Sequence, residues 1–285
     1  MRLRIALPLF VLFGLQLPSV APELTLPCPV SSMAVAADGS GIWFVCSANS
    51  KAQHPRNERE AYWLPTATKT PVKIEEGSPN LAILPAPSGS RALIVGTPRS
   101  GQWQASLYDK QQPIKELPID ASFVLWGADS HKIYFYGGST VQADVWDILG
   151  IYDLNSGAIS KIILHEPTEI LRVCQANGNV YSVTPPYPHF DGSTIEYTPT
   201  IQFVRKVQGW VGALFSADCT YVASEYSYHG PLPWSIYEVK TGRKMYHFSA
   251  LDQADEDDVY VPVEWNPRHD SVLLREYFPK HDGPR

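Results

Sequence analysis

The chain has 285 residues, 44% of them hydrophobic and 18% charged, which is enough to bury a sizeable core and excludes disorder. Its 25 prolines, 19 glycines and 12% aromatic residues suit many short strands joined by tight turns better than they suit helices. The formal net charge of -6 and the lack of a basic run argue against a nucleic-acid partner, because a phosphate-binding surface needs clustered Lys and Arg.

Residues 1–21 resemble a secretory signal. Arg2 and Arg4 precede the apolar run 5–17, which is too short to span a bilayer comfortably but typical of a signal core. Ala21 is followed by Pro22, which hinders cleavage there, so an uncleaved signal anchor is the alternative. We expect residues 22–285 to form an exported domain, periplasmic or extracellular, with membrane contact only through an uncleaved N-terminal segment.

The stretch 210–248 predicts one complete four-stranded antiparallel sheet. Two apolar strands, 210–215 and 220–225, flank a polar turn, and after a loop with two prolines the strands 235–239 and 243–248 flank the turn Lys240-Thr-Gly242. This is the pattern of one blade of a β-propeller.

The first half of this unit recurs along the chain as an apolar residue, a turn and a second apolar residue seven positions later. Successive units begin 51, 40, 47, 42 and 50 residues apart, against roughly 40 to 50 per blade in known propeller repeats. The pairs are Val35/Ile42, Ala86/Leu93, Trp126/Ile133, Val173/Val180, Phe215/Val222 and Trp265/Val272. Six units are therefore implied.

The second half is clearest at Ile151-Tyr-Asp-Leu-Asn-Ser-Gly157 and at Ile236-Tyr-Glu-Val-Lys-Thr-Gly242, which match position by position. Together with Leu214-Phe-Ser-Ala-Asp-Cys219, these segments resemble the hairpin patterns of TolB-like and WD-type propeller repeats. The resemblance implies an all-β fold over about residues 31–276. The turn Ser-Pro-Asp-Gly is nowhere intact, and Trp146-Asp147 falls in a predicted loop rather than at a blade end.

We therefore expect a single β-propeller of about six four-stranded blades. Only nine residues follow the strand 272–276, so the last blade is predicted to be incomplete, and the segment 23–26 could supply one outer strand and close the ring.

The longest predicted loops join the second strand of a blade to the third and share one face, where a binding site is most plausible. They are 47–60, 137–147, 184–193 and 227–233, with the acidic linker 251–258 on the same face. The candidate binding residues are Asp144, Trp146, Tyr187, His189, Asp191, Tyr228 and His229. The alternative for each candidate is that it is an ordinary solvated loop residue without a role in binding. Tryptophans in predicted strands, such as Trp43, Trp63 and Trp265, are expected to pack between blades instead.

The four cysteines permit two disulfides. Cys174 and Cys219 fall on the short-turn face of neighbouring blades, whereas Cys28 and Cys46 fall on the long-loop face of the first. The blade placement therefore predicts the pairs Cys28–Cys46 and Cys174–Cys219.

We expect no metal and no cofactor. The cysteines and histidines lack ligand spacing, and the acidic residues of 251–258 lack a calcium-loop pattern. The sequence also lacks a nucleophile elbow, a His-Glu-x-x-His motif and a phosphate-cradling glycine loop. The hypothesis that the protein is an enzyme is therefore less favoured. The sequence favours a monomeric, non-catalytic propeller that binds a protein, peptide or glycan. The alternatives are a propeller hydrolase or lyase with a loop-built site, and a degenerate propeller without a ligand.

Overall fold

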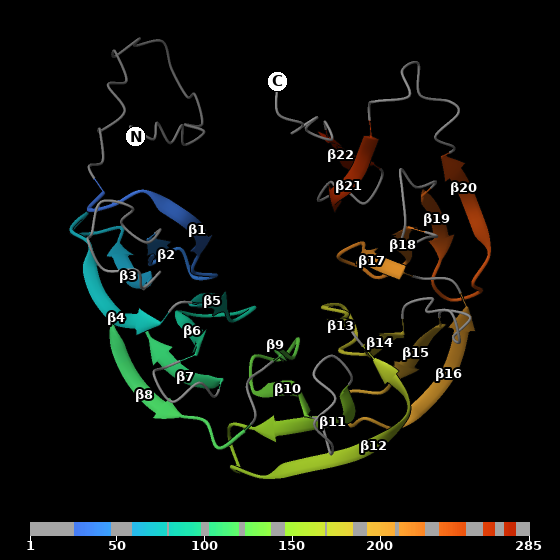
Figure 1. Ribbon diagram of the computed structural model, residues 1–285, viewed down its shortest axis with the longest axis horizontal. Helices are drawn as coiled ribbons and strands as arrows, with labels where there is room; N and C mark the ends of the chain where they lie inside the picture. The colour runs from blue at the N-terminus through green and yellow to red at the C-terminus, as the bar shows by residue number, and fades with distance from the viewer. Residues whose placement is uncertain are drawn as a thin grey trace, which may run out of the picture. The chain divides into compact units, whose positions relative to one another are not determined.

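The computed structural model describes residues 26–46, 59–78, 80–97, 103–119, 123–137, 146–168, 170–184, 193–208, 211–225, 234–248, 259–265 and 271–277. All regular structure in these ranges is β-strand, in five four-stranded antiparallel sheets and one two-stranded sheet (Figure 1). Within the described residues there is no helix whose length and apolarity would let it cross a membrane. The fold is an all-β propeller, as the sequence predicts.

Each four-stranded sheet is one blade, and its strands follow one another in the chain. Blade 1 contains β1 (Val30–Val35), β2 (Gly41–Cys46), β3 (Arg59–Pro65) and β4 (Val72–Ser78). Blade 2 contains β5 (Ala82–Pro85), β6 (Arg91–Gly96), β7 (Gln104–Asp109) and β8 (Gln112–Glu116). Blade 3 contains β9 (Phe123–Trp126), β10 (Lys132–Gly137), β11 (Trp146–Asp153) and β12 (Ile159–Thr168).

Blade 4 contains β13 (Ile170–Val173), β14 (Val180–Thr184), β15 (Ser193–Tyr197) and β16 (Phe203–Gln208). Blade 5 contains β17 (Val211–Phe215), β18 (Tyr221–Glu225), β19 (Trp234–Glu238) and β20 (Lys244–Phe248). The last sheet pairs β21 (Val259–Trp265) with β22 (Val272–Tyr277).

The repeat marker locates the first hairpin correctly in five of the six sheets. Val35 pairs with Ile42, Trp126 with Ile133, Val173 with Val180, Phe215 with Val222, and Trp265 with Val272. In blade 2 the predicted pair Ala86/Leu93 was wrong, because Leu93 pairs with Leu84, two residues earlier, and Ala92 pairs with Pro85. The apolar run 81–86 has no polar break, so its register could not be fixed from the pattern alone.

Two compact units divide the chain, residues 1–118 and 119–285. In the first unit, Trp43, Val45 and Trp63 of blade 1 pack with Ala92, Ile94 and Tyr108 of blade 2. In the second, Tyr134 and Leu149 of blade 3 pack with Val180 and Ile195 of blade 4, and Trp265 of β21 packs with Ala223 and Trp234 of blade 5. Trp43, Trp63 and Trp265 thus fill the inter-blade layers, which confirms their structural role.

Tight turns close the hairpins because their residues suit left-handed backbone. Gly157 and Gly242, predicted to end equivalent turns, have φ of 71° and 70°. Their amides donate to the carbonyls of Asp153 and Glu238, each at 2.8 Å. At the first-hairpin turns of blades 3 and 5 the left-handed positions are held by Ser130 and Cys219 instead, with φ of 56° and 57°.

The last sheet has two strands among the described residues, and the prediction that this blade is incomplete stays a prediction. Blade 1 is built entirely from its own consecutive strands. The proposed closing strand 23–26 lies outside the described residues except for Leu26, which is not in a strand.

Candidate functional site

The predicted binding residues fall almost entirely outside the described part of the chain. Asp144, Tyr187, His189, Asp191, Tyr228 and His229 belong to the connections 138–145, 185–192 and 226–233, which lie outside it. Trp146 is the first residue of β11, so the prediction that Trp146 and Asp147 lie in a loop was wrong. Its pairing with Thr168 extends β11 to this point.

The strand bounds do place these connections on one edge of each blade. The connection from second to third strand spans 7 to 12 residues in the five blades, whereas first-to-second and third-to-fourth connections span 2 to 6. Because the strands alternate direction, the second-to-third connection of each blade leaves one edge of that blade, which we call its long-connection edge. The opposite edge, with the short hairpin turns, is the short-turn edge.

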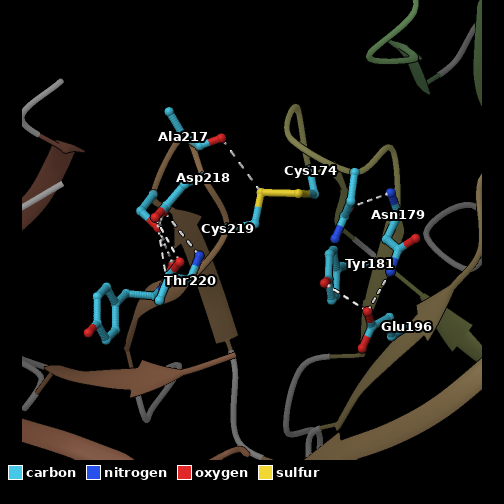
Figure 2. Close-up of a disulfide and its surroundings, with 11 residues drawn as sticks. Cys174, Asn179, Tyr181, Glu196, Ala217, Asp218, Cys219 and Thr220 are labelled. Atoms are coloured by element: carbon cyan, nitrogen blue, oxygen red, sulfur yellow. Dashed lines mark hydrogen bonds between the residues drawn. A yellow bond between two sulfur atoms is a disulfide. The ribbon is translucent and has the colours of Figure 1, made fainter. Parts of the chain in front are cut away.

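The best-defined polar cluster in the described residues lies between blades 4 and 5 (Figure 2). Glu196 of β15 is buried, and its Oε1 accepts hydrogen bonds from the Tyr181 hydroxyl at 3.0 Å and from the Asn179 amide at 2.7 Å. Its Oε2 accepts from Arg205 Nε at 2.6 Å. Burial, with the negative charge of Glu196 and the hydrogen bond to it, raises the pKa of Tyr181, so the phenol stays neutral and donating.

Arg205 extends this cluster into the next blade. Its two terminal nitrogens donate to the carbonyls of Val239 and Lys240, in the turn between β19 and β20. A carboxylate that already accepts three hydrogen bonds is poorly suited to take a proton from a substrate. We therefore interpret Glu196 and Arg205 as an inter-blade clamp rather than as catalytic groups.

The disulfide Cys174–Cys219 joins the same two blades on the short-turn edge (Figure 2). The two Cα atoms are 5.9 Å apart, and both residues pack in the apolar layer with Tyr181, Val183, Val222 and Val239. Asp218 shapes the Cys219 turn, because its carboxylate accepts from Ser216 Oγ at 2.6 Å and from the Thr220 amide at 3.1 Å.

The second disulfide, Cys28–Cys46, has a Cα separation of 5.7 Å and ties the segment before β1 to the end of β2. Leu26 and Cys28 pack there against Phe44, Tyr62 and Leu64. Both pairs are those that the blade placement predicts. Two disulfides fit an oxidising compartment.

Among the described residues are two solvent-open hollows, each lying between neighbouring blades beside a short hairpin turn. One, of about 630 Å³, lies in the second unit and is lined by Arg205, Lys206, Val207, Thr241 and Gly242. The other, of about 490 Å³, lies in the first unit, and its lining includes Trp63, Thr66, Asp109, Lys110, Gln111 and Gln112. Sequence reasoning missed both, since it sought binding residues only in the long connections.

A serine–histidine pair lies in blade 5, but its burial is unsuited to catalysis. Ser235 Oγ lies 2.9 Å from His247 Nδ1. Only 2% of Ser235 is exposed, so a substrate could not reach the hydroxyl. Nowhere in the described ranges do three or more His, Cys, Asp or Glu side chains gather as a metal site would require.

No protein-family model matches the sequence, and no curated protein matches it either. Solved structures do resemble the fold. TolB from Acinetobacter baumannii is 16% identical, with a TM-score of 0.52 over 76% of this chain. The alignment covers 53% of TolB, so this chain spans about half the length of that protein.

Two further structures are similar over more of the chain. The β-propeller domain of the Trilobed protease from Pyrococcus furiosus, which has an open velcro topology, is 14% identical with a TM-score of 0.59, covering 90% of this chain and 79% of that domain. Hydrazine synthase from Kuenenia stuttgartiensis is 12% identical with a TM-score of 0.55, covering 85% and 72%. At these identities the likeness establishes the fold alone, which is that of a β-propeller.

Proposed function

We propose that this chain is an exported, non-catalytic β-propeller that binds a protein, peptide or glycan through its long-connection edge. The proposal rests on the difference in length between the two kinds of connection within a blade. Second-to-third connections span 7 to 12 residues in all five blades, while all the hairpin turns span 2 to 6. A rigid scaffold with its long connections on one edge is the usual way in which loops present binding residues.

The composition of these connections supports the same proposal. The segments Pro185-Pro-Tyr-Pro-His-Phe190 and Tyr226-Ser-Tyr-His-Gly-Pro-Leu-Pro233 are rich in aromatic residues and proline and carry little charge. Aromatic rings supply contact area at a small cost in conformational entropy, and proline lowers that cost further. Such segments favour peptide or sugar ligands over nucleic acid, whose phosphates need clustered cations.

Export is supported by two independent features. The N-terminal 21 residues have the composition of a secretory signal, and both disulfides fit an oxidising compartment. Fusion of residues 1–30 to a reporter enzyme that is active only after export tests this part. Export of the fusion supports the proposal, and retention in the cytoplasm contradicts it.

The binding proposal is tested by selection from a displayed peptide library and a glycan array on residues 22–285, produced under oxidising conditions. Residues 185–192 and 226–233 are replaced by Gly/Ser segments of equal length in one variant. Library members that bind this variant are removed before the selection, because they bind elsewhere on the protein. Asn155→Ser, in the turn between β11 and β12, is the matched control on the short-turn edge. We expect ligands that bind the wild type and the control but not the loop-replaced variant.

The competing function is a hydrolase or lyase using Asp144, His189, Asp191 and His229. It predicts turnover of peptide or glycoside substrates that His189→Ala abolishes, and such turnover would contradict the non-catalytic proposal. A propeller without any ligand predicts an empty selection, which would contradict it equally.

A further inference from the structure

The hollow between blades 1 and 2 lies at the end of these blades opposite their long connections. It lies on the short-turn edge, where the turn after β3 faces the turn between β7 and β8. Its volume of about 490 Å³ lies within the range of small-ligand sites. Its apolar lining consists of Trp63, which is only 2% exposed, and the more accessible Pro65 and Ala67, and polar side chains of the two turns form its rim.

Hydrogen bonds hold both walls of this hollow in place. On one side the Thr66 amide and hydroxyl both donate to the Ser40 carbonyl, each at 3.0 Å. On the other, the Lys110 amide donates to the Ser90 carbonyl at 3.1 Å, and the Ser90 hydroxyl donates to Asp109. A bond from the Asp38 amide to the Gly89 carbonyl, 3.3 Å long, joins the two blades. The rim is therefore preorganised, which lowers the entropic cost of binding.

The position of the Trp63 ring depends on a glycine. A Cβ at position 41 would overlap the six-membered ring of Trp63, so Gly41 is what allows the indole to lie at this depth. The Tyr108 hydroxyl donates to Glu75 Oε2 at 2.7 Å and fixes β7 of blade 2 against β4 of blade 1.

The rim chemistry defines the ligand class. Its charged lining residues are one carboxylate, Asp109, and one ammonium, Lys110, so it has no surplus cation for an anion. Gln111, Gln112 and Thr66 add amide and hydroxyl groups that both donate and accept. Neighbouring hydroxyls of a sugar match such a rim, and the C–H face of the sugar ring matches the apolar lining at Pro65 and Ala67. We propose that this hollow binds a neutral saccharide.

The hollow between blades 4 and 5 differs from this one in the chemistry of its lining residues. Arg205 and Lys206 line it, so it combines two cations with Val207 and the turn Thr241-Gly242 and lacks an amide or carboxylate rim. A neutral saccharide is expected to bind in the first unit and not in the second. Thr241→Ala is therefore a matched control variant for a rim substitution.

Saturation-transfer NMR and titration calorimetry of residues 22–285 with maltotriose, cellotriose and N-acetylchitotriose test this inference. Gln111→Ala and Gln112→Ala remove rim amides that are exposed, so they should leave folding intact. We expect at least one of these sugars to bind with a millimolar Kd, and each variant to weaken binding by about fivefold to tenfold. Thr241→Ala should leave the Kd unchanged.

The inference would be overturned by a lack of saccharide binding or by a Kd that neither glutamine variant changes. The loop-replaced variant separates this inference from the proposed function. Saccharide binding that disappears on replacement of 185–192 and 226–233, but survives Gln112→Ala, assigns the sugar to the long-connection edge and also overturns it.

Discussion

Arg205 and Glu196 face each other across neighbouring strands of blade 4, with Nε and Oε2 2.6 Å apart, and the same guanidinium bonds two carbonyls of blade 5. The Glu196 side chain is 8% exposed and that of Arg205 30%. The ion pair therefore contributes to the joint between two blades as well as to the sheet in which it lies.

Replacing Arg205 by alanine should destabilise the protein by about 2–4 kcal/mol, because it leaves a buried carboxylate without its cation. Urea unfolding of the variant measures this loss. Lys73→Ala is the matched control: the exposed pair Lys73–Glu60, 3.1 Å long, should contribute only about 0–1 kcal/mol. Equal losses in the two variants would show that the Glu196 cluster is no clamp.

The disulfides should differ in their effect on stability because they close loops of different length. Their sequence separations are 45 residues for Cys174–Cys219 and 18 for Cys28–Cys46. Loop-closure entropy then gives about 4 and about 3 kcal/mol respectively. Denaturant unfolding of the two double Cys→Ser variants checks the order, and mass mapping of non-reduced peptides checks the pairs. Any other linkage would refute the blade placement that predicts them.

Gly150→Ala should cost about 1–3 kcal/mol, since the new methyl group would overlap the ring of Phe135 on the neighbouring strand β10. Gly39→Ala is an informative comparison. Gly39 has a φ of 68° but open space around it, so alanine should add only backbone strain of about 1 kcal/mol. Thermal unfolding of both variants separates steric overlap from strain, and a milder effect at position 150 would argue against the register of blade 3.

Stability should fall in acid partly through the turn aspartates. The backbone amide and the hydroxyl of Ser156 hydrogen-bond Asp153 and hold the pKa of its carboxyl below the ordinary 3.8. A carboxyl with a lowered folded-state pKa stabilises the fold above its unfolded-state pKa, and this contribution is lost as pH falls from near 3.8 through the lower folded value. Asp153→Asn should flatten that part of the pH profile of the urea midpoint. An unchanged slope would exclude the contribution.

Sequence patterns predict most of this fold because they are local. A hairpin needs an apolar pair, a turn and a glycine or aspartate at fixed offsets, and Phe215/Val222 or Ile151 to Gly157 contain all of these within a few residues. The disulfide partners follow once each cysteine is assigned to a blade edge. In blade 2 the partner of Leu93 lies two residues before the predicted one, because the apolar run does not fix a register.

The clamp and the hollows could not be predicted in the same way. Glu196 lies in β15 and Arg205 in β16, and nothing in their local sequence indicates that they form an ion pair. Contact with Val239 and Lys240 depends on how successive blades pack, which no local pattern encodes. The hollow at Trp63 likewise combines turns of two blades that are more than forty residues apart.

The central claim is best tested by the affinity of a selected ligand for the wild type and for the variant with 185–192 and 226–233 replaced, measured by calorimetry alongside the thermal midpoint. The account predicts a loss of affinity of about tenfold or more with little change in midpoint, because binding resides in the long connections and stability in the blades. Unchanged affinity in the replaced variant would contradict it.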